Sequence, residues 1–332
     1  MVRLLFPEDG YFFDTHTDIQ NTFIDLIHMQ GTDAALAWLG PVKNNCECTY
    51  PRALTFTWLP DGAPEYRLEL AEDVDFTNAH LIVTRDDRAE VDTLKIGRRY
   101  FWRVNGSAAR WFETDSAVPR FIRIDGVPNV RDMGGGKIRQ GILYRGGAMD
   151  GKYAITEAGK RIFREVLGIR TQIELRKEML GKLDCSPAGA DVQLAVLPYR
   201  PYREVFEDEH RQGICRIMEF LADESNYPIY FHCRGGADRT GMIALYLRAL
   251  VGETDDEIHT DYELTGLSAY AAGESEGADG FRRRTAPYYA EFLKNLSAYA
   301  PGRPICDAAR AFLLDCGVKE EHMRRIVEII GV

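Results

Sequence analysis

Hydrophobic and polar residues alternate with a period of two along much of the first third of the chain. Leu54, Phe56 and Trp58 alternate with threonines, and the same pattern recurs over 66–70 and 100–104. This period indicates half-buried β-strands, because successive side chains of a strand point to opposite faces of the sheet. Turn-forming Pro, Asp, Asn and Gly residues separate the runs. Short strands at this spacing predict a small β-sandwich.

The remaining two-thirds of the chain alternates short apolar runs with longer runs whose apolar residues recur at helical spacing. The residues from Thr254 to Glu257 have the form of a capping box, which opens a helix. Strands that alternate with helices predict an α/β domain with a central, mostly parallel sheet flanked by helices. The expected elements are strands over 170–175, 192–198 and 228–231 and helices over 156–167, 211–222, 240–251, 304–316 and 319–330.

We therefore predict two domains. Residues 1–118 are expected to form an all-β sandwich with an N-terminal extension, and residues 119–332 the α/β domain. Pro119 lies in the segment that joins them. Within the extension, residues 18–30 have the pattern of a short amphipathic helix, with their apolar side chains on one face.

The composition is that of a soluble globular protein, with 332 residues of which 45% are hydrophobic and 28% charged. No apolar run approaches the roughly 18 residues of a membrane span, and the N-terminal apolar patch is too short for a signal-peptide core. We therefore expect a cytoplasmic protein without stable membrane insertion. The net charge of −10 disfavours nonspecific binding to nucleic acids. Seven cysteines, an odd number, argue against a disulfide framework.

Residues 229–241 carry the chemistry. They pass from a predicted strand through a glycine-containing loop into a predicted helix, and Cys233 is followed after five residues by Arg239 and Thr240. Five intervening residues allow the loop to wrap a tetrahedral oxyanion, with its backbone N–H groups and the helix N-terminus directed inward. The same field favours a thiolate at Cys233, and the planar guanidinium of Arg239 holds two oxygens of the anion. The Thr240 hydroxyl is placed to donate a hydrogen bond to the sulfur. The alternative, a buried cysteine that happens to precede a basic residue, does not account for the whole combination.

This stretch resembles the signature of the cysteine-dependent protein tyrosine phosphatases, and most closely the loop HCxxGKDRTG of the bacterial branch of atypical tyrosine and phosphoinositide phosphatases. Residues 129–135, 141–146 and 167–176 resemble further motifs of that branch, so the resemblance extends over residues 120–332. It implies that the loop binds the phosphate and that three residues of the further motifs lie at the substrate site. The implied substrate-binding residues are Arg234, Gly235, Gly236, Ala237 and Gly241 in the loop, and Asp132, Arg145 and Glu174 outside it.

Three positions depart from the family pattern. Ala237 stands where the family has Lys, which removes one phosphate-facing cation unless Arg234 replaces it. Glu174 stands where the family has Asp, and Gly146 where it has Ser. The three arginines of the further motifs either line the mouth of the pocket or form structural ion pairs: Arg131, Arg145 and Arg176.

The proton donor is less defined by the sequence than the nucleophile. Other phosphatase branches place an Asp on a loop upstream of the cysteine, but residues 193–203 contain no acidic residue. The resemblance makes Asp238, inside the loop, the expected general acid, and its alternative role is to cap the following helix. Asp132 and Glu174 are the other candidates. His232 is expected to order the loop rather than to act as a base.

Two further groups of residues allow a functional and a structural interpretation. Tyr199, Tyr202 and Phe206 either form an aromatic wall for a phenyl ring or pack in the core. Residues 282–284 are three arginines in a lid expected over 266–290. They either grip a second phosphate or form a solvated charge run.

Residues 42–116 resemble a fibronectin type III domain, in which a strand with Tyr and Trp packs the core. The resemblance rests on residues 66–76 and 94–104. If the α/β domain alone kept full activity and substrate choice, the sandwich would be a docking or spacing element for a protein partner.

Together these features predict a two-domain phosphatase that works through a phosphocysteine intermediate. The favoured substrate is protein phosphotyrosine. A phosphoinositide or another polyol phosphate is the alternative substrate, and a phosphate-binding module with weak catalysis is a further alternative. Neither a metal nor another cofactor is expected.

Overall fold

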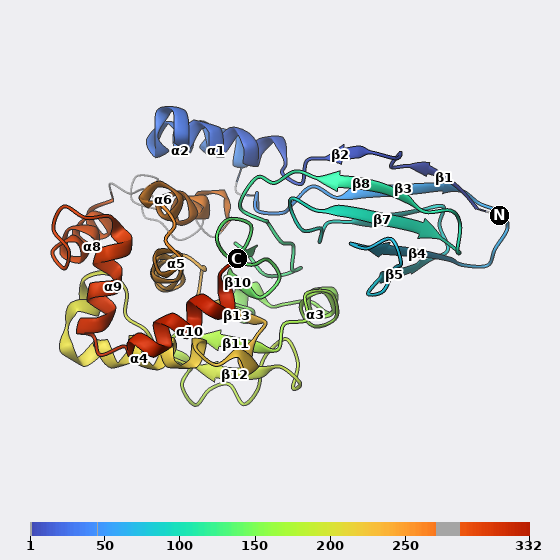
Figure 1. Ribbon diagram of the computed structural model, residues 1–332. Coiled ribbons are helices and arrows are strands. Elements are labelled where there is room, and N and C mark those ends of the chain that lie inside the picture. Colours follow the sequence, from blue (N-terminus) through green and yellow to red (C-terminus); the bar gives the residue numbers. More distant parts are fainter. Residues whose placement is uncertain (1, 45, 270–285) are drawn as a thin grey trace.

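A β-rich half and an α/β half make up the computed structural model, which describes residues 2–44, 46–269 and 286–332 (Figure 1). The N-terminus lies at the far end of the β-rich half, and the C-terminus lies near the point where the two halves meet. The α/β character expected for the second part of the chain is confirmed. The boundary between 118 and 119 stays a prediction.

The β-rich half contains two sheets that share one core. Phe56 on one sheet meets the rings of Trp102 and Phe112 on the other, at centroid distances of 5.1 and 5.7 Å, and all three side chains are fully buried. The three runs of alternating residues are strands, as predicted, while the fibronectin type III resemblance itself stays a prediction. The strands are β1 (Arg3–Phe6), β2 (Tyr11–Phe13), β3 (Leu54–Leu59), β4 (Tyr66–Ala71), β5 (His80–Thr84), β6 (Arg88–Val91), β7 (Arg99–Val104) and β8 (Arg110–Thr114), in the orders β1-β3-β6 and β2-β8-β7-β4-β5.

Two helices interrupt the strands of the β-rich half. They are α1 (Asp18–Gln30), which was predicted within the N-terminal extension, and α2 (Thr32–Lys43), which was not. α1 covers the residues predicted for it and begins at a capping box in which the side chains of Thr17 and Gln20 bond to each other's backbone N–H groups.

The apolar faces of these helices pack against the α/β half instead of the sandwich. Phe23 of α1 is fully buried in a cluster with Phe121, Leu264 and Leu267. In Figure 1 both helices lie next to α6 (Asp255–Glu263). The α/β half therefore supplies the apolar surface that this amphipathic helix pair needs.

A five-stranded sheet forms the centre of the α/β half. Its strands are β9 (Arg131–Asp132), β10 (Leu143–Gly146), β11 (Thr171–Glu174), β12 (Gln193–Val196) and β13 (Ile229–His232). Their order is β12-β11-β13-β10-β9, and all neighbours are parallel except the pair β9 and β10. The predicted, mostly parallel sheet is therefore confirmed. β13 is its middle strand, and open α/β sheets bind ligands beyond the carboxyl ends of such strands.

Both faces of this sheet are covered. The helical elements of this half include α3 (Glu157–Arg161), the π-helical turn η2 (Ile162–Val166), η3 (Lys177–Met179), η4 (Tyr202–Phe206), α4 (Asp208–Leu221), α5 (Asp238–Leu250), α6, η6 (Leu264–Leu267), α8 (Pro287–Ser297), α9 (Ile305–Asp315) and α10 (Glu320–Ile330). In β13, Ile229 and Phe231 belong to a core with α4, α5, α9 and α10, whereas Tyr230 between them packs with Phe163 of η2. A strand buried on both faces appears as a continuous apolar run, as 228–231 does.

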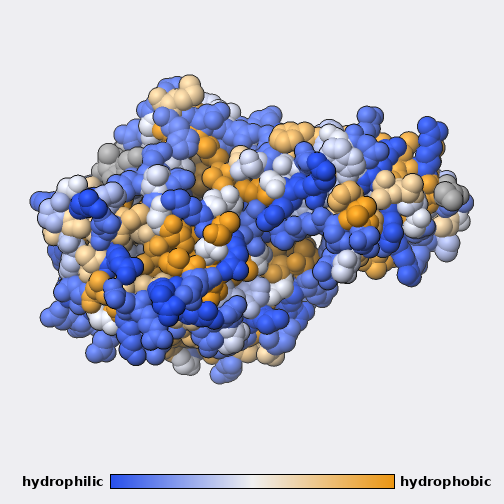
Figure 2. Space-filling model, viewed as in Figure 1, coloured by the Kyte–Doolittle hydropathy of each residue, from blue (hydrophilic) through white to orange (hydrophobic). Residues whose placement is uncertain are grey.

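Figure 2 shows hydrophilic residues over most of the visible surface, with hydrophobic residues in separate patches on both halves. Phe12, Leu81 and Val83 are exposed on the larger sheet of the sandwich. Scattered apolar side chains of this kind are normal on protein surfaces. Among the described residues, every helix is too short or too polar to span a membrane.

Replacing Phe23 by Ala should lower the free energy of unfolding by about 3–5 kcal/mol, because it leaves a cavity between α1 and the α/β half. The matched control is Met29→Ala on the same helix, where the side chain is 76% exposed and the expected change is within about 0.5 kcal/mol. Urea unfolding measures both variants. Equal stabilities would contradict the packing of α1 against the α/β half.

Candidate active site

The motif segment folds into the predicted strand, loop and helix. β13 leads into the loop 233–237, and α5 begins at Asp238. The loop lies tightly against neighbouring backbone at Gly236, whose φ is +67°. A Cβ at this position would lie 2.4 Å from the carbonyl group of Gly146, so the loop requires glycine here.

Three carbonyl groups of the loop are tied to the surrounding protein. The bonds run from the Ala148 N–H to the Arg234 carbonyl (2.9 Å), from Asn129 Nδ2 to the Gly235 carbonyl (2.9 Å) and from Arg145 Nη2 to the Gly236 carbonyl (2.8 Å). In a trans peptide the C=O and the following N–H point in opposite directions. The N–H groups of residues 235–237 are therefore turned away from these anchors, which is the orientation that anion binding by a loop requires.

Five residues of the motif segment line a pocket of about 350 Å³ at the amino end of α5. Cys233 is only 4% exposed, whereas the Arg234 side chain is 58% exposed, so the cysteine lies deep and Arg234 lies at the rim. Glu178 of η3 and Pro201 and Tyr202 near η4 complete the wall. The five motif residues are Cys233, Arg234, Gly235, Asp238 and Arg239.

Glu178 brings a negative charge to the two arginines of the pocket. Its Oε1 lies 3.5 Å from Arg239 Nη1 and 4.0 Å from Arg234 Nη2. Partial burial acts to raise the pKa of Glu178, but its own backbone N–H and the charges of Arg239 and Arg176 outweigh this and hold the pKa below its usual value. Glu178 is therefore ionised at neutral pH.

Asp238 accepts a hydrogen bond from the hydroxyl group of Tyr202. The Tyr202 oxygen also lies 2.8 Å from that of Tyr262 on α6, and the Tyr202 backbone has a φ of +58°, which is uncommon for an aromatic residue. The N-cap residue of α5 is Ala237, so Asp238 is the first residue of the helix and does not occupy the capping position considered for it. Its carboxyl group is instead held at the pocket wall by a tyrosine.

His232 lies behind the loop and is fully buried. Its Nδ1 lies 3.1 Å from the Cys233 carbonyl, which only accepts hydrogen bonds, and its Nε2 lies 2.8 Å from Gln172 Nε2. Burial lowers the pKa of His232, although Glu174 at 3.6 Å favours the charged form. These two hydrogen-bond partners indicate a neutral imidazole ring that carries its proton on Nδ1. The hydrogen bond from Nδ1 then holds the backbone at Cys233.

The arginines around the loop are held by one buried carboxylate, Asp261 of α6. Asp261 pairs with Arg145, with Arg131 Nε at 3.2 Å and with Arg248 Nη2 at 3.3 Å. Burial acts to raise the pKa of Asp261, but the three guanidinium groups lower it to well below its usual range. Asp261 is therefore ionised. It holds the side chain of Arg145, which in turn donates to the Gly236 carbonyl of the loop.

Three residues expected at the substrate site, Asp132, Arg145 and Glu174, lie outside the pocket and are fully buried. Asp132 accepts a hydrogen bond from Arg120 at 2.9 Å, and Glu174 pairs with Arg176 at 2.7 Å. Their charges already have partners inside the protein. All three are absent from the residues that line the pocket, so their roles as substrate contacts, and those of Asp132 and Glu174 as proton donors, stay predictions.

Four other predicted residues are buried and do not line the pocket: Gly236 and Ala237 in the loop, and Thr240 and Gly241 in the first turn of α5. Thr240 Oγ1 is buried without a hydrogen-bond partner among the described residues. The predicted hydrogen bond from this hydroxyl to the sulfur of Cys233 is therefore not formed in this structure.

Of the three aromatic residues considered as a wall, Tyr202 lines the pocket. Tyr199 and Phe206 pack in or against the main core of the α/β half. The arginines at 282–284 and most of the lid expected over 266–290 lie outside the described residues.

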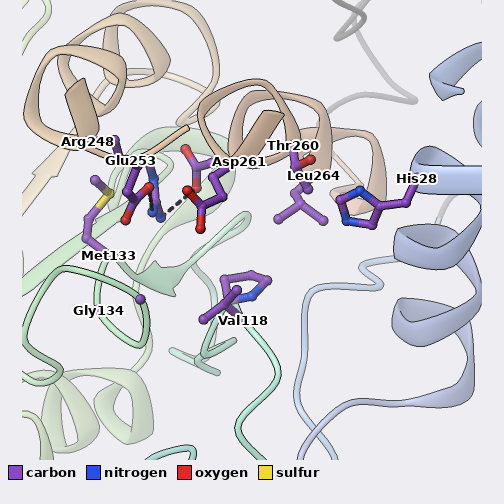
Figure 3. Close-up of a pocket in the computed structure, with 12 residues that line it drawn as sticks. His28, Val118, Met133, Gly134, Arg248, Glu253, Thr260, Asp261 and Leu264 are labelled. Carbon is purple, nitrogen blue, oxygen red and sulfur yellow. Dashed lines mark hydrogen bonds and ion pairs between the residues drawn. The ribbon is translucent and has the colours of Figure 1, made fainter. Parts of the chain in front are cut away.

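A second pocket, of about 80 Å³, lies where α1 meets the α/β half (Figure 3). Figure 3 shows Arg248, Glu253 and Asp261 on one side of it and His28 of α1 on the other, with the ion pair between Arg248 and Asp261 dashed. Val118 also lines this pocket, but no residue of the motif segment does. This pocket therefore lies between α1 and the ion pairs of Asp261, and is separate from the pocket at Cys233.

Glu178, Pro201 and Asp261 are among the residues of the site and its support that were not predicted. Asp261 follows the buried Ile258 by three positions, so helical spacing places it on the buried face of α6, and this polar residue on an apolar face was a usable signal. Glu178 and Pro201 lie in connecting segments without a periodic pattern. Only the fold brings them to the loop.

Comparison with known proteins identifies the α/β half. A family model described as "Tyrosine phosphatase family" matches residues 122–330. No curated protein matches the chain. Among solved structures, a similar chain is the core catalytic domain of the PP-IP phosphatase SIW14 from S. cerevisiae, in complex with citrate. It is 16% identical, with a TM-score of 0.29, and the match covers 49% of this chain and 91% of that chain.

Replacing Asp261 by Asn should lower the free energy of unfolding by about 3–5 kcal/mol, because it leaves three buried guanidinium groups without their counter-ion. The control is Asp256→Asn on the same helix, where the side chain is 58% exposed and the expected loss is below about 1 kcal/mol. Urea unfolding at pH 7 measures both. Equal losses would contradict the central role of Asp261.

The wild type and Asp261→Asn together test the pH dependence. The pKa of Asp261 is lower in the folded protein than in the unfolded chain, where it is about 4, so at acid pH the unfolded chain binds the additional proton. The stabilisation by Asp261 is therefore complete above about pH 5 and is lost as the pH falls below this value. The free energy of unfolding should decrease more steeply between pH 5 and 3 in the wild type than in Asp261→Asn. Parallel curves would contradict the shift.

Proposed function

Because the chain belongs to the tyrosine phosphatase family, which indicates a cysteine-dependent phosphatase, we propose that Cys233 is its nucleophile and that its substrate is a phosphotyrosine-containing protein. The observation that carries this proposal is the convergence of Cys233, Asp238 and Arg239 in one pocket at the amino end of α5. The orientation of the loop N–H groups and the positive end of the helix support phosphate binding there.

The reaction proceeds in two displacements at phosphorus. The Cys233 thiolate attacks, the Sγ–P bond forms and the bond from phosphorus to the ester oxygen breaks. Water then attacks the phosphocysteine, the Sγ–P bond breaks and inorganic phosphate leaves. Arg239 and the loop N–H groups hold the equatorial oxygens in both transition states. Thr240, whose buried hydroxyl has no partner among the described residues, donates to the sulfur as it leaves.

Asp238 moves the protons. It donates one to the leaving oxygen in the first step and takes one from water in the second, which returns it to its starting state. The hydrogen bond from Tyr202 keeps its carboxyl group at the pocket wall. Glu178 is a poor donor, because its lowered pKa keeps it ionised.

The walls of the pocket favour an aryl phosphate over a polyphosphate. Tyr202 and Pro201 line the pocket, and each brings a ring that a phenyl group could contact. Ala237 contributes no charge where related loops carry Lys, and Glu178 offsets part of the charge of Arg239. A substrate with one phosphate and an apolar ring meets these conditions.

An inositol phosphate is the second candidate substrate. One observation favours it, the exposed guanidinium of Arg234 at the rim of the pocket. A cation at this place would contact a second phosphate on a polyol ring.

The wild-type protein should release phosphate from a phosphotyrosine peptide faster than from an inositol phosphate, and Cys233→Ser should release none above the blank from either. Assay of inorganic phosphate with both substrates side by side measures this. A preference for the inositol phosphate would make it the favoured substrate in place of the phosphotyrosine protein. Undiminished release by Cys233→Ser would refute the proposed nucleophile. If the folded wild type released none, the chain would be a binding module.

Replacing Asp238 by Asn should lower kcat by about 10²-fold or more for an alkyl phosphate, whose leaving group needs a proton. The loss should be much smaller for p-nitrophenyl phosphate, whose leaving group departs as an anion. Tyr202→Phe, which keeps the ring and removes the hydroxyl, should reproduce the same leaving-group dependence in weaker form. Equal losses of Asp238→Asn on both substrates would place the proton donor elsewhere.

A further inference from the structure

Glu178 is an acidic residue in a pocket whose proposed ligand is an anion, and the mechanism above does not use it. Its carboxylate lies 3.5 Å from Arg239 Nη1 and 4.0 Å from Arg234 Nη2. These two guanidinium groups are the cations that the described residues of the pocket wall contribute. A phosphate bound at Arg239 therefore has to share this group with Glu178 or displace the carboxylate from it.

The position of Glu178 follows from how η3 is attached to the sheet. Arg176, two residues earlier, is bound by both carboxylate oxygens of Glu174 at the end of β11, at 2.9 and 2.7 Å, and also reaches Asp150 at 2.6 Å. The start of η3 is therefore anchored. The Glu178 side chain itself is 40% exposed, which leaves it room to move away from the arginines.

We infer that Glu178 is an internal competitor of the phosphate: it pairs with Arg239 while the pocket is empty and leaves this pairing when substrate binds. This inference rests on the proposed phosphate-binding role of the pocket. Like charges repel, so the carboxylate disfavours a substrate more strongly the more negative charge that substrate places near the rim. Glu178 therefore selects substrates with a single phosphate over polyphosphorylated ones.

The effect is modest in size. Exposed ion pairs are weakened by solvent and are worth about 0.2–1 kcal/mol, which corresponds to a change in affinity of up to about fivefold. Removing the charge of Glu178 should therefore tighten binding of an anion by about two- to fivefold.

Calorimetric titration of inorganic phosphate into the full chain tests this directly. The Kd for phosphate should be about two- to fivefold lower in Glu178→Gln than in the wild type. Glu219→Gln on α4 is the matched control, because it removes the same charge from an exposed residue outside the pocket, and its Kd should be unchanged. Inorganic phosphate is not turned over, so the result does not depend on catalysis.

The selectivity is tested by KM values for a phosphotyrosine peptide and an inositol polyphosphate. Glu178→Gln should lower KM more for the polyphosphate, and Glu178→Lys should increase this difference.

Unchanged or weaker phosphate binding by Glu178→Gln, with the wild type binding phosphate, would overturn the inference and make Glu178 a support for Arg239. A wild type that binds no phosphate would overturn the proposed function as well. Tighter binding by Glu178→Gln without turnover of any substrate would uphold the inference and refute the catalytic proposal.

Discussion

The ion pairs of one buried carboxylate, Asp261, hold the loop around Cys233 in place. Three guanidinium groups surround this buried carboxylate, and without it they would repel one another. Arg145, one of the three, donates to the carbonyl group of Gly236. The ion pairs of Asp261 thus constrain the geometry of the loop. A carbonyl group that is held in place also fixes the direction of the N–H group in the same peptide.

The charges of the catalytic half fall into two sets that behave differently. Those behind the loop, around Asp261 and between Glu174 and Arg176, are buried, and moving any one of them would leave an unpaired buried charge. Those at the pocket, Glu178 and the arginines it approaches, are partly exposed and exchange partners at little cost in free energy. A rigid support with a replaceable counter-ion is what a site needs if it is to bind and release an anion repeatedly.

Much of this organisation was predictable from the sequence, because it depends on local periodicity and on one continuous motif. The strands of the sandwich, the helix α1 and the order of strand, loop and helix around Cys233 all follow from neighbouring residues. The positions of Asp132 and Glu174 did not, because a motif does not reveal whether its charged side chains point to the ligand or into the core. Asp261 and Glu178 lie 28 residues after and 55 residues before Cys233 in the chain, and only tertiary packing joins them to the site.

The N-terminal helices extend this dependence to the first part of the chain. Lys43 at the end of α2 donates to the Gly266 carbonyl at 2.8 Å, and the Cys48 N–H donates to the Leu267 carbonyl at 3.0 Å. Both acceptors lie in η6, directly after the helix that carries Asp261. The segment between β2 and β3 therefore braces the same helix that supports the loop. Although α1 and α2 lie between two strands of the sandwich in the sequence, they pack as part of the α/β half.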